Sequence, residues 1–177
     1  MKRAILLFSI AACFGCSTRG PLFHDSGHTA TISASSYELS LIDKRARVDA
    51  RSLSIPAVTF PGQKVDLAPP LDAELRALAR ATIDRCVVPG PHALVFTINV
   101  LEGRQGFVAH ALSEEESVSL RLQLEVRLKE MPDPLSISDG ASWGTRSSLD
   151  ASPARIQKMY RQSFEQALLE ALSRVAE

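Results

Sequence analysis

Residues 117–129 read "SVSLRLQLEVRLK", and this stretch decides the fold class of the chain. Apolar and polar side chains alternate without a break, the apolar ones being Val118, Leu120, Leu122, Leu124, Val126 and Leu128. A sustained period of two predicts a long strand with one buried and one solvated face. Strands with a solvated face belong to antiparallel sheets, because parallel sheets are covered on both sides. We therefore expect an antiparallel sheet, whose polar face carries Arg121, Glu125 and Arg127 as a candidate surface for a partner.

Weaker patterns predict the neighbouring strands. They are "YELSLID" (37–43), "SLSIPAVTF" (52–60), "HALVFTINVLEG" (92–103) and "SISDGASWGTRSS" (136–148). Pro56 places the second at an edge or a bulge, and Trp143 is interpreted as the large apolar contributor of the last. Gly103 and Gly106 indicate a bend or a bulge before "FVAHA". The glutamates of "SEEE" (113–116) are interpreted as a solvated turn. The charged connection "DKRARVDAR" (43–51) is interpreted as a solvated loop, with a partner-facing loop as the alternative.

Two segments have the apolar periodicity of amphipathic helices. The first, residues 68–86, begins around Pro69 and Pro70 and places Cys86 in its last turn, on the apolar face. The second begins near Ser152 and Pro153, and a stripe from Ile156 to Val175 runs to the C-terminus. Two such helices can cover one face of a sheet. We expect a two-layer α+β domain, with an antiparallel sheet of about four to six strands and both helices on one face.

The N-terminus has the pattern of a secretory signal peptide, with a buried N-terminal helix as the alternative. Lys2 and Arg3 precede an apolar run from Ala4 to Gly15, which is shorter than the about 20 residues of a membrane-spanning helix. The stretch "AACFGCSTRG" (11–20) resembles a bacterial lipoprotein signal, in which a lipobox ends in a cysteine that receives a diacylglyceryl group. The resemblance favours Cys16 as the lipidated residue, with Cys13 as the alternative. Ser17 follows Cys16 and is not an aspartate, so the resemblance also implies the outer membrane, with the domain facing the periplasm.

This interpretation divides the chain into a signal peptide (1–15), a lipidated cysteine with a flexible tether (16–36) and a single domain (37–177). Without residues 1–15 the chain has 18 Lys and Arg against 20 Asp and Glu, so its charge is close to −2. This balance provides no basic field for nucleic acid. The tether contains "HDSGH" (24–28), whose two histidines are interpreted as a solvated linker, with metal ligation as the alternative.

No catalytic motif is present in the sequence. It contains no G-x-S-x-G, P-loop, H-E-x-x-H or dinucleotide fingerprint. Cys86 is interpreted as a small buried residue rather than a nucleophile with His92 or His110, because burial and a helix C-terminus disfavour the thiolate. We therefore expect a protein that is not an enzyme and has no cofactor and no metal site.

The lipobox, the stretch "LIDKRARVDAR" (41–51) after a first strand, the central sheet and the C-terminal helix resemble small Gram-negative lipoproteins of the YajG type. The layout is also similar to LptE-like lipoproteins and to auxiliary lipoproteins of ABC transport systems. The residues that carry this resemblance are Cys16 and the D-x-R pair Asp43 and Arg45. It implies a non-enzymatic accessory role in envelope assembly or transport, bound to a larger envelope protein. The alternatives are a lipoprotein that binds a lipid or small ligand, and a cell-envelope hydrolase without a recognisable motif.

Overall fold

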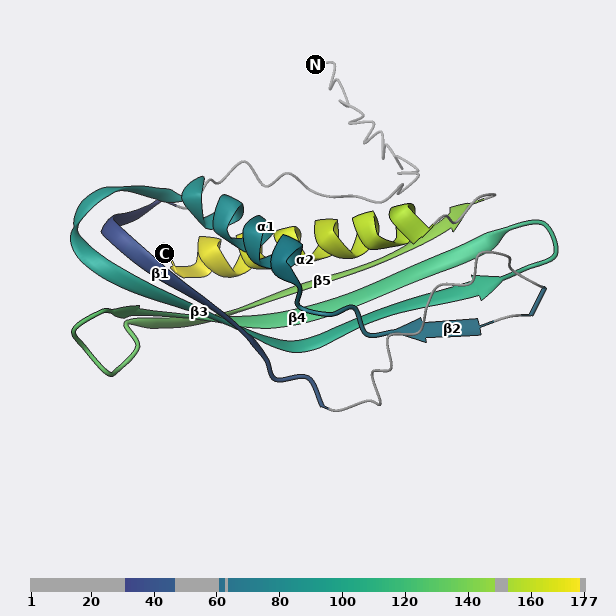
Figure 1. Cartoon of the computed structure of the whole chain (residues 1–177), viewed down its shortest axis with the longest axis horizontal. Helices are drawn as coiled ribbons and strands as arrows, with labels where there is room; N and C mark the ends of the chain where they lie inside the picture. The colour runs from purple at the N-terminus through teal and green to yellow at the C-terminus, as the bar shows by residue number, and fades with distance from the viewer. Residues whose placement is uncertain (1–30, 47–60, 63, 149–152, 176–177) are drawn as a thin grey trace, which may run out of the picture.

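The computed structural model describes residues 31–46, 61–62, 64–148 and 153–175. In chain order the elements are β1 (Ile32–Asp43), β2 (Lys64–Leu67), α1 (Ala73–Asp84), β3 (Val87–Ala109), β4 (Glu114–Leu128), β5 (Ser136–Ser148) and α2 (Pro153–Val175). Figure 1 shows one elongated sheet with α1 and α2 lying above it. An α+β domain with a sheet and two helices is therefore confirmed.

The sheet is mixed, which corrects the antiparallel prediction. Its order is β1-β3-β4-β5, and β2 pairs with the far half of β3. The β3–β4, β4–β5 and β2–β3 pairs are antiparallel, whereas β1 runs parallel to β3. The connection between β1 and β3 contains α1, and a crossover of this kind returns the chain to the end where it began. Alternation within one strand identifies its solvated face but not the direction of a distant neighbour.

Several predicted boundaries need correction. The strand at "YELSLID" already begins at Ile32, so residues 32–36 belong to β1 and not to the tether. β3 is one continuous strand that includes "VVPGP" and "FVA", and the predicted bend or bulge corresponds to a register shift between Val100 and Glu102. The glutamates of "SEEE" start β4 and do not form a turn. β2 was not predicted, and the strand predicted at 52–60 lies outside the described residues.

The first helix is shorter than its sequence pattern. Asp72 caps it, its side chain accepting a hydrogen bond from the Leu75 amide at 2.8 Å, so the helix begins at Ala73 and not at the prolines. It ends at Asp84, and Cys86 follows it as a residue that is only 2% exposed. The burial of Cys86 is therefore as predicted, but its place in the last turn is wrong.

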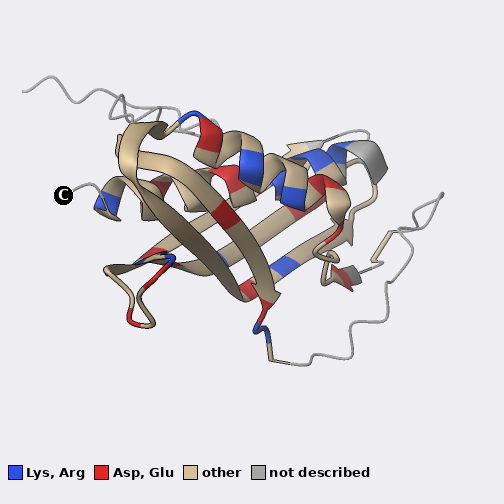
Figure 2. Ribbon diagram, turned by 60° about the vertical axis from the view of Figure 1, so that its left-hand side comes forward, with Lys and Arg blue, Asp and Glu red and all other residues tan. Residues whose placement is uncertain are grey.

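The core lies between the sheet and the two helices. It combines alternate residues of β3 and β4 with the apolar stripes of α1 and α2, including Phe96, Ile98, Leu122, Leu124, Leu75, Ala79, Ile83, Phe164, Leu168 and Leu172. Figure 2 shows charged residues of both signs along the helices, whereas long stretches of the strands carry none. The predicted apolar face of β4 is confirmed, since Leu122 and Leu124 are fully buried.

Helix α2 packs unusually close to β5. A Cβ atom on Gly140 would lie 1.9 Å from the Ala167 carbonyl oxygen, and the Ser138 hydroxyl donates to the Ala171 carbonyl at 2.8 Å. The inward positions of β5 are therefore occupied by small residues. Trp143 alternates with them and is 82% exposed, so its predicted contribution to the core is wrong.

Candidate functional site

The candidate partner surface is the face of the sheet that points away from the helices, which we call the open face. Arg121, Glu125 and Arg127 all lie on it, because they alternate along β4 with the buried leucines. Arg121 is exposed, while Glu125 and Arg127 are partly buried. The predicted residues thus share a face, but only Arg121 is fully available to a partner.

Glu125 and Arg127 are engaged within the protein. Glu125 Oε1 accepts a hydrogen bond from the side-chain Nδ2 of Asn99 at 2.7 Å, and Asn99 is fully buried. Arg127 Nη1 donates to the Met131 carbonyl at 3.3 Å. These contacts give both side chains a structural role at this end of the open face. A partner that bound Glu125 or Arg127 directly would have to break these hydrogen bonds.

Trp143 is the residue on this face that the sequence analysis missed. In the pairing of β4 with β5 it stands opposite Ser119, and Ser119 in turn stands opposite Arg104 of β3. The adjacent row places Ala141 opposite Arg121. The sequence did contain a pattern that places Trp143 on the open face. Small residues alternate with it along β5 and mark the opposite face as the one closest to a helix: Ser138, Gly140, Ser142 and Gly144.

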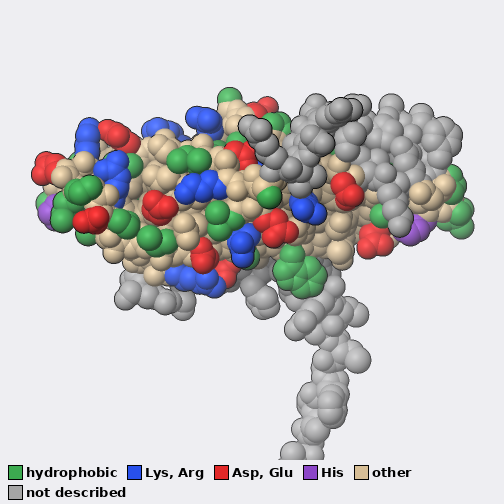
Figure 3. Space-filling model, turned by 90° about the horizontal axis from the view of Figure 1, so that it is seen from below, with side chains coloured by type: hydrophobic (Ala, Val, Ile, Leu, Met, Phe, Trp, Pro, Cys, Tyr) green, Lys and Arg blue, Asp and Glu red, His purple; other side chains and the backbone are tan. Residues whose placement is uncertain are grey.

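Figure 3 looks onto the open side of the sheet, opposite the helices. Hydrophobic, basic and acidic side chains are interspersed there, and neither charge dominates the visible described surface. Glu38 and Lys129 neutralise each other at one end, with an Oε1–Nζ distance of 2.7 Å. Such a mixed surface differs from the uniformly basic patch that binds nucleic acid.

The D-x-R pair at the end of β1, Asp43 and Arg45, connects this strand to the segment before α1 through hydrogen bonds. Arg45 donates to both carboxylate oxygens of Asp43, from Nε at 2.9 Å and from Nη2 at 2.7 Å. Its Nη1 reaches the Pro69 carbonyl at 2.8 Å. The hydrogen bond from Arg45 lowers the pKa of Asp43, and burial raises the pKa of nearby Tyr160 to about 12. Asp43 and Arg45 therefore join β1 to the segment before α1, and their geometry indicates packing instead of catalysis.

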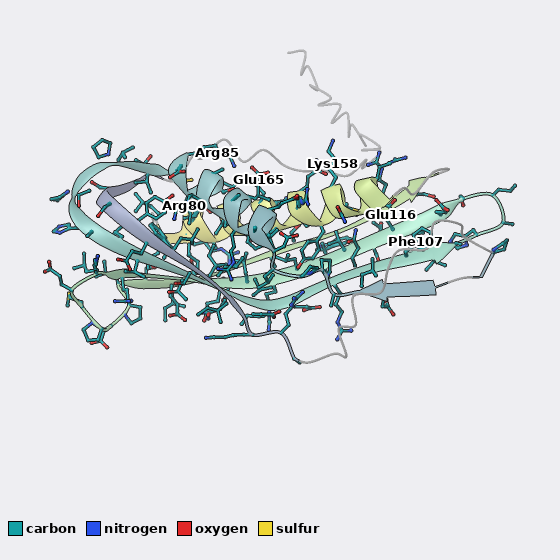
Figure 4. All side chains as sticks on the ribbon, viewed as in Figure 1. Arg80, Arg85, Phe107, Glu116, Lys158 and Glu165 are labelled. Atoms are coloured by element: carbon teal, nitrogen blue, oxygen red, sulfur yellow. The ribbon has the colours of Figure 1, made fainter. Side chains whose placement is uncertain are left out.

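Glu116 is a buried acid in the layer between sheet and helices. It is 1% exposed and stands opposite Phe107 across the β3–β4 pair; both are labelled in Figure 4. Neither carboxylate oxygen has a hydrogen-bond partner among the described residues. Desolvation raises the pKa of Glu116, while Arg155 and Arg146 act in the opposite direction. The prediction that this glutamate is solvated is wrong.

The other candidate residues do not assemble into a site. Burial raises the pKa of the Cys86 thiol, which disfavours a nucleophilic role, and His92 and His110 are both exposed. Across residues 31–46, 61–62, 64–148 and 153–175, no group of three His, Cys, Asp or Glu residues could hold a metal ion. Neither helix in these ranges is long and apolar enough to cross a membrane. Cys13, Cys16 and the histidines of "HDSGH" lie outside the described residues.

Comparisons with known proteins yield structural likenesses only. No family model matches the chain, and no curated protein matches it. Among solved structures, the protein XCC0632 from Xanthomonas campestris, described as family-model DUF330, is similar with a TM-score of 0.45 and 13% identity over 84% of this chain and 90% of that one. A minor lipoprotein from Acinetobacter baumannii is similar with a TM-score of 0.36 and 14% identity, over 80% of this chain and 92% of that one. Lipoprotein GNA1162 from Neisseria meningitidis is similar with a TM-score of 0.33 and 12% identity, over 71% of this chain and 92% of that one. Since every TM-score is below 0.5, these likenesses establish neither a family nor an activity for this chain.

Proposed function

We propose that this chain is a lipid-anchored lipoprotein of the outer membrane, facing the periplasm, which acts as a non-enzymatic interaction module in envelope assembly or transport. The observation that carries the proposal is the open face, where Trp143 and Arg121 are exposed as diagonal neighbours on β5 and β4. The N-terminal sequence supports the location, because a charged start and a short apolar run lead to Cys16.

The energetics of a sheet face favour an interaction role. Tryptophan and arginine are enriched among the residues that dominate binding energy at protein interfaces. β4 lies between β3 and β5 and is paired with both, so the backbone that carries Arg121 needs no ordering on binding. Among the described elements, α1 and α2 lie on the opposite side of the sheet (Figure 1), and Arg121 and Trp143 are exposed on this one.

The anchor is tested by mass spectrometry of the mature N-terminus. An acylated Cys16 is the expected result, and an acylated Cys13 would keep the anchor but move its position. A soluble protein with an unmodified N-terminus beyond residue 16 would contradict lipid anchoring.

The interaction role is tested by chemical crosslinking in intact cells, followed by identification of the captured proteins. We expect one envelope protein to be captured by the native chain and lost with Arg121→Ala, although that variant remains folded. Arg76→Ala is the matched control, because Arg76 is exposed on α1. Turnover of a cell-wall or lipid substrate by the pure protein, abolished by one polar substitution, would replace this function with an enzymatic one.

A further inference from the structure

The turn between β4 and β5 carries a cluster of exposed apolar side chains, which we call the apolar tip. Eight large hydrophobic side chains are exposed in the described part of the chain, and three of them lie within seven residues here: Met131 at 46%, Leu135 at 58% and Ile137 at 55%. Turns are usually polar, and exposed apolar side chains are normally scattered singly. A cluster of three in and beside one turn therefore calls for a partner that covers it.

The backbone of the apolar tip has few amide hydrogens that still need water. Pro132 and Pro134 have no amide hydrogen. The amides of Met131 and Leu135 donate to carbonyl oxygens of β4 at 3.1 and 2.7 Å. Burying an amide that has no hydrogen-bond partner is costly, and that cost does not arise at these four residues. The tip can therefore leave water at a lower cost than a turn with unbonded amides.

The apolar tip lies at the end of the sheet where the chain enters the domain. β1 is parallel to β3 and β4 is antiparallel to it, so the beginning of β1 and the end of β4 lie at the same end, at the left of Figure 1. Through β3, Leu128 shares a row with Tyr37, which is five residues, or about 17 Å, from the beginning of β1. Lys129 in the turn also forms an ion pair with Glu38 of β1, at 2.7 Å.

The predicted lipid anchor is within reach of this end. Residues 17–30 separate Cys16 from the described part of the domain, and these 14 residues span at most about 50 Å when fully extended. The opposite tip of the sheet, where Leu112 is 87% exposed, lies beyond the pairing of residues 94–109 of β3 with β4, which is itself about 50 Å long. An anchor at Cys16 therefore brings the apolar tip to a bilayer far more readily than the Leu112 tip.

We propose that the apolar tip enters the headgroup region of the bilayer that holds the lipid anchor, and that the lipid it contacts is a neutral, zwitterionic phospholipid. This inference rests on the proposed function, specifically on the anchor at Cys16. A stable protein interface takes about 20–30 residues from each partner, more than one turn supplies, whereas a bilayer needs only apolar side chains that reach it.

The charges of the turn select the type of lipid. Glu130 and Asp133 are exposed, and Lys129 is already paired with Glu38. No cation of the turn is therefore left to attract an anionic lipid, and the two carboxylates would be repelled by one. Apolar contact with a neutral surface holds the tip, and Asp133 limits its depth, because a charge is costly to carry below the headgroups.

The test uses the full acylated chain in phosphatidylcholine vesicles, after mass spectrometry has identified the acylated cysteine. A fluorophore that is sensitive to polarity is attached at Leu135→Cys, and in a matched control at Leu112→Cys in the opposite tip. Cys86 is buried, so it does not compete for the label. We expect a blue shift of the emission, and quenching by spin-labelled phospholipids, at position 135 and neither at position 112.

Substitutions in the turn separate apolar contact from charge. Combining Met131→Ser with Ile137→Ser should abolish the shift of the label at position 135, because both side chains are exposed and supply the apolar contact. Asp133→Asn should retain or increase the shift, since it removes a carboxylate that resists insertion. Replacing phosphatidylcholine by phosphatidylglycerol should not increase it.

Four results would overturn this inference: no shift at position 135 in an acylated chain, an equal shift at position 112, a larger shift with phosphatidylglycerol, and the same shift without vesicles as the protein concentration rises. The last result would assign the apolar tip to a second copy of the chain. In each of these cases the anchor and the open-face interaction stand. A mature chain without an acylated cysteine would refute the proposed anchor, and this inference with it.

Discussion

Replacing Gly140 by alanine should separate α2 from β5. The added Cβ would lie 1.9 Å from the Ala167 carbonyl oxygen and 2.8 Å from its carbon, where ordinary contact begins at 3.4 Å. Both atoms belong to the helix backbone, so no side chain can rotate away. α2 would have to move by about 1.5 Å at this point, and it is the helix that covers β4 and β5.

Overpacking of a core typically costs about 1–3 kcal/mol, and a backbone clash belongs at the upper end of that range. For a domain of this size, about 3 kcal/mol lowers the melting temperature by about 6–12 °C. The matched control is Gly144→Ala, on the same strand and face, because its Cβ would meet only the Met159 methyl at 3.6 Å and a Val118 methyl at 4.0 Å. Both variants lose one glycine, so the change in unfolded-chain entropy is shared.

Thermal unfolding followed by circular dichroism, with urea titration as a second measurement, compares the two variants. We expect Gly144→Ala to be as stable as the native protein, or more stable by up to about 1 kcal/mol. Equal melting temperatures for the two variants would refute the close packing of α2 on β5, and with it the orientation of Trp143 on the open face.

Leu122→Asp should unfold the domain, because it introduces an unpaired charge into the core at a cost of several kcal/mol, whereas Arg121→Ala should stay within about 0.5 kcal/mol in the same urea titration. Glu116→Gln should raise the melting temperature at pH 7 and leave it unchanged below about pH 4.5. The pKa of Glu116 is raised in the folded state, so the native protein loses stability as the pH rises through that pKa. The glutamine side chain of the variant stays neutral, so the variant has no such loss. An equal gain in melting temperature at both pH values would contradict the raised pKa of Glu116. Glu170→Ala should cost about 1 kcal/mol and promote association at the edge of β5, because Glu170 accepts from the Ala141 amide at 3.0 Å; unchanged sedimentation and stability would argue against this protection.

The sequence was most informative where periodicity was strong. The alternation around Leu122 correctly predicts β4 and its two faces, and β5 begins and ends at the predicted residues. Most of the predicted stripe of α2 is buried, including Phe164 and Leu168. These features depend on contacts between one element and an apolar layer, which a single segment can encode.

Features that depend on two distant segments were not predicted. The parallel pairing of β1 with β3 follows from the crossover through α1, and nothing in the "YELSLID" pattern specifies it. Trp143 was assigned to the core by its size, but the close approach of α2 to Gly140 admits only small residues on that side. Glu116 was assigned to a turn by its charge, although it is in phase with Val118 and Leu120 and lies on their buried face.

The central claim, that the open face of the sheet binds a protein, is tested most directly by photo-crosslinking in the intact envelope. A photoreactive amino acid is placed at Ser119 or Arg121 on the open face, and at Arg76 or Leu169 on the helix layer. All four positions are at least partly exposed, so the replacements should not disturb the core. We expect one defined envelope protein to be crosslinked from Ser119 and Arg121 and not from Arg76 and Leu169. Crosslinks from the helix layer alone, or from neither face, would contradict the account.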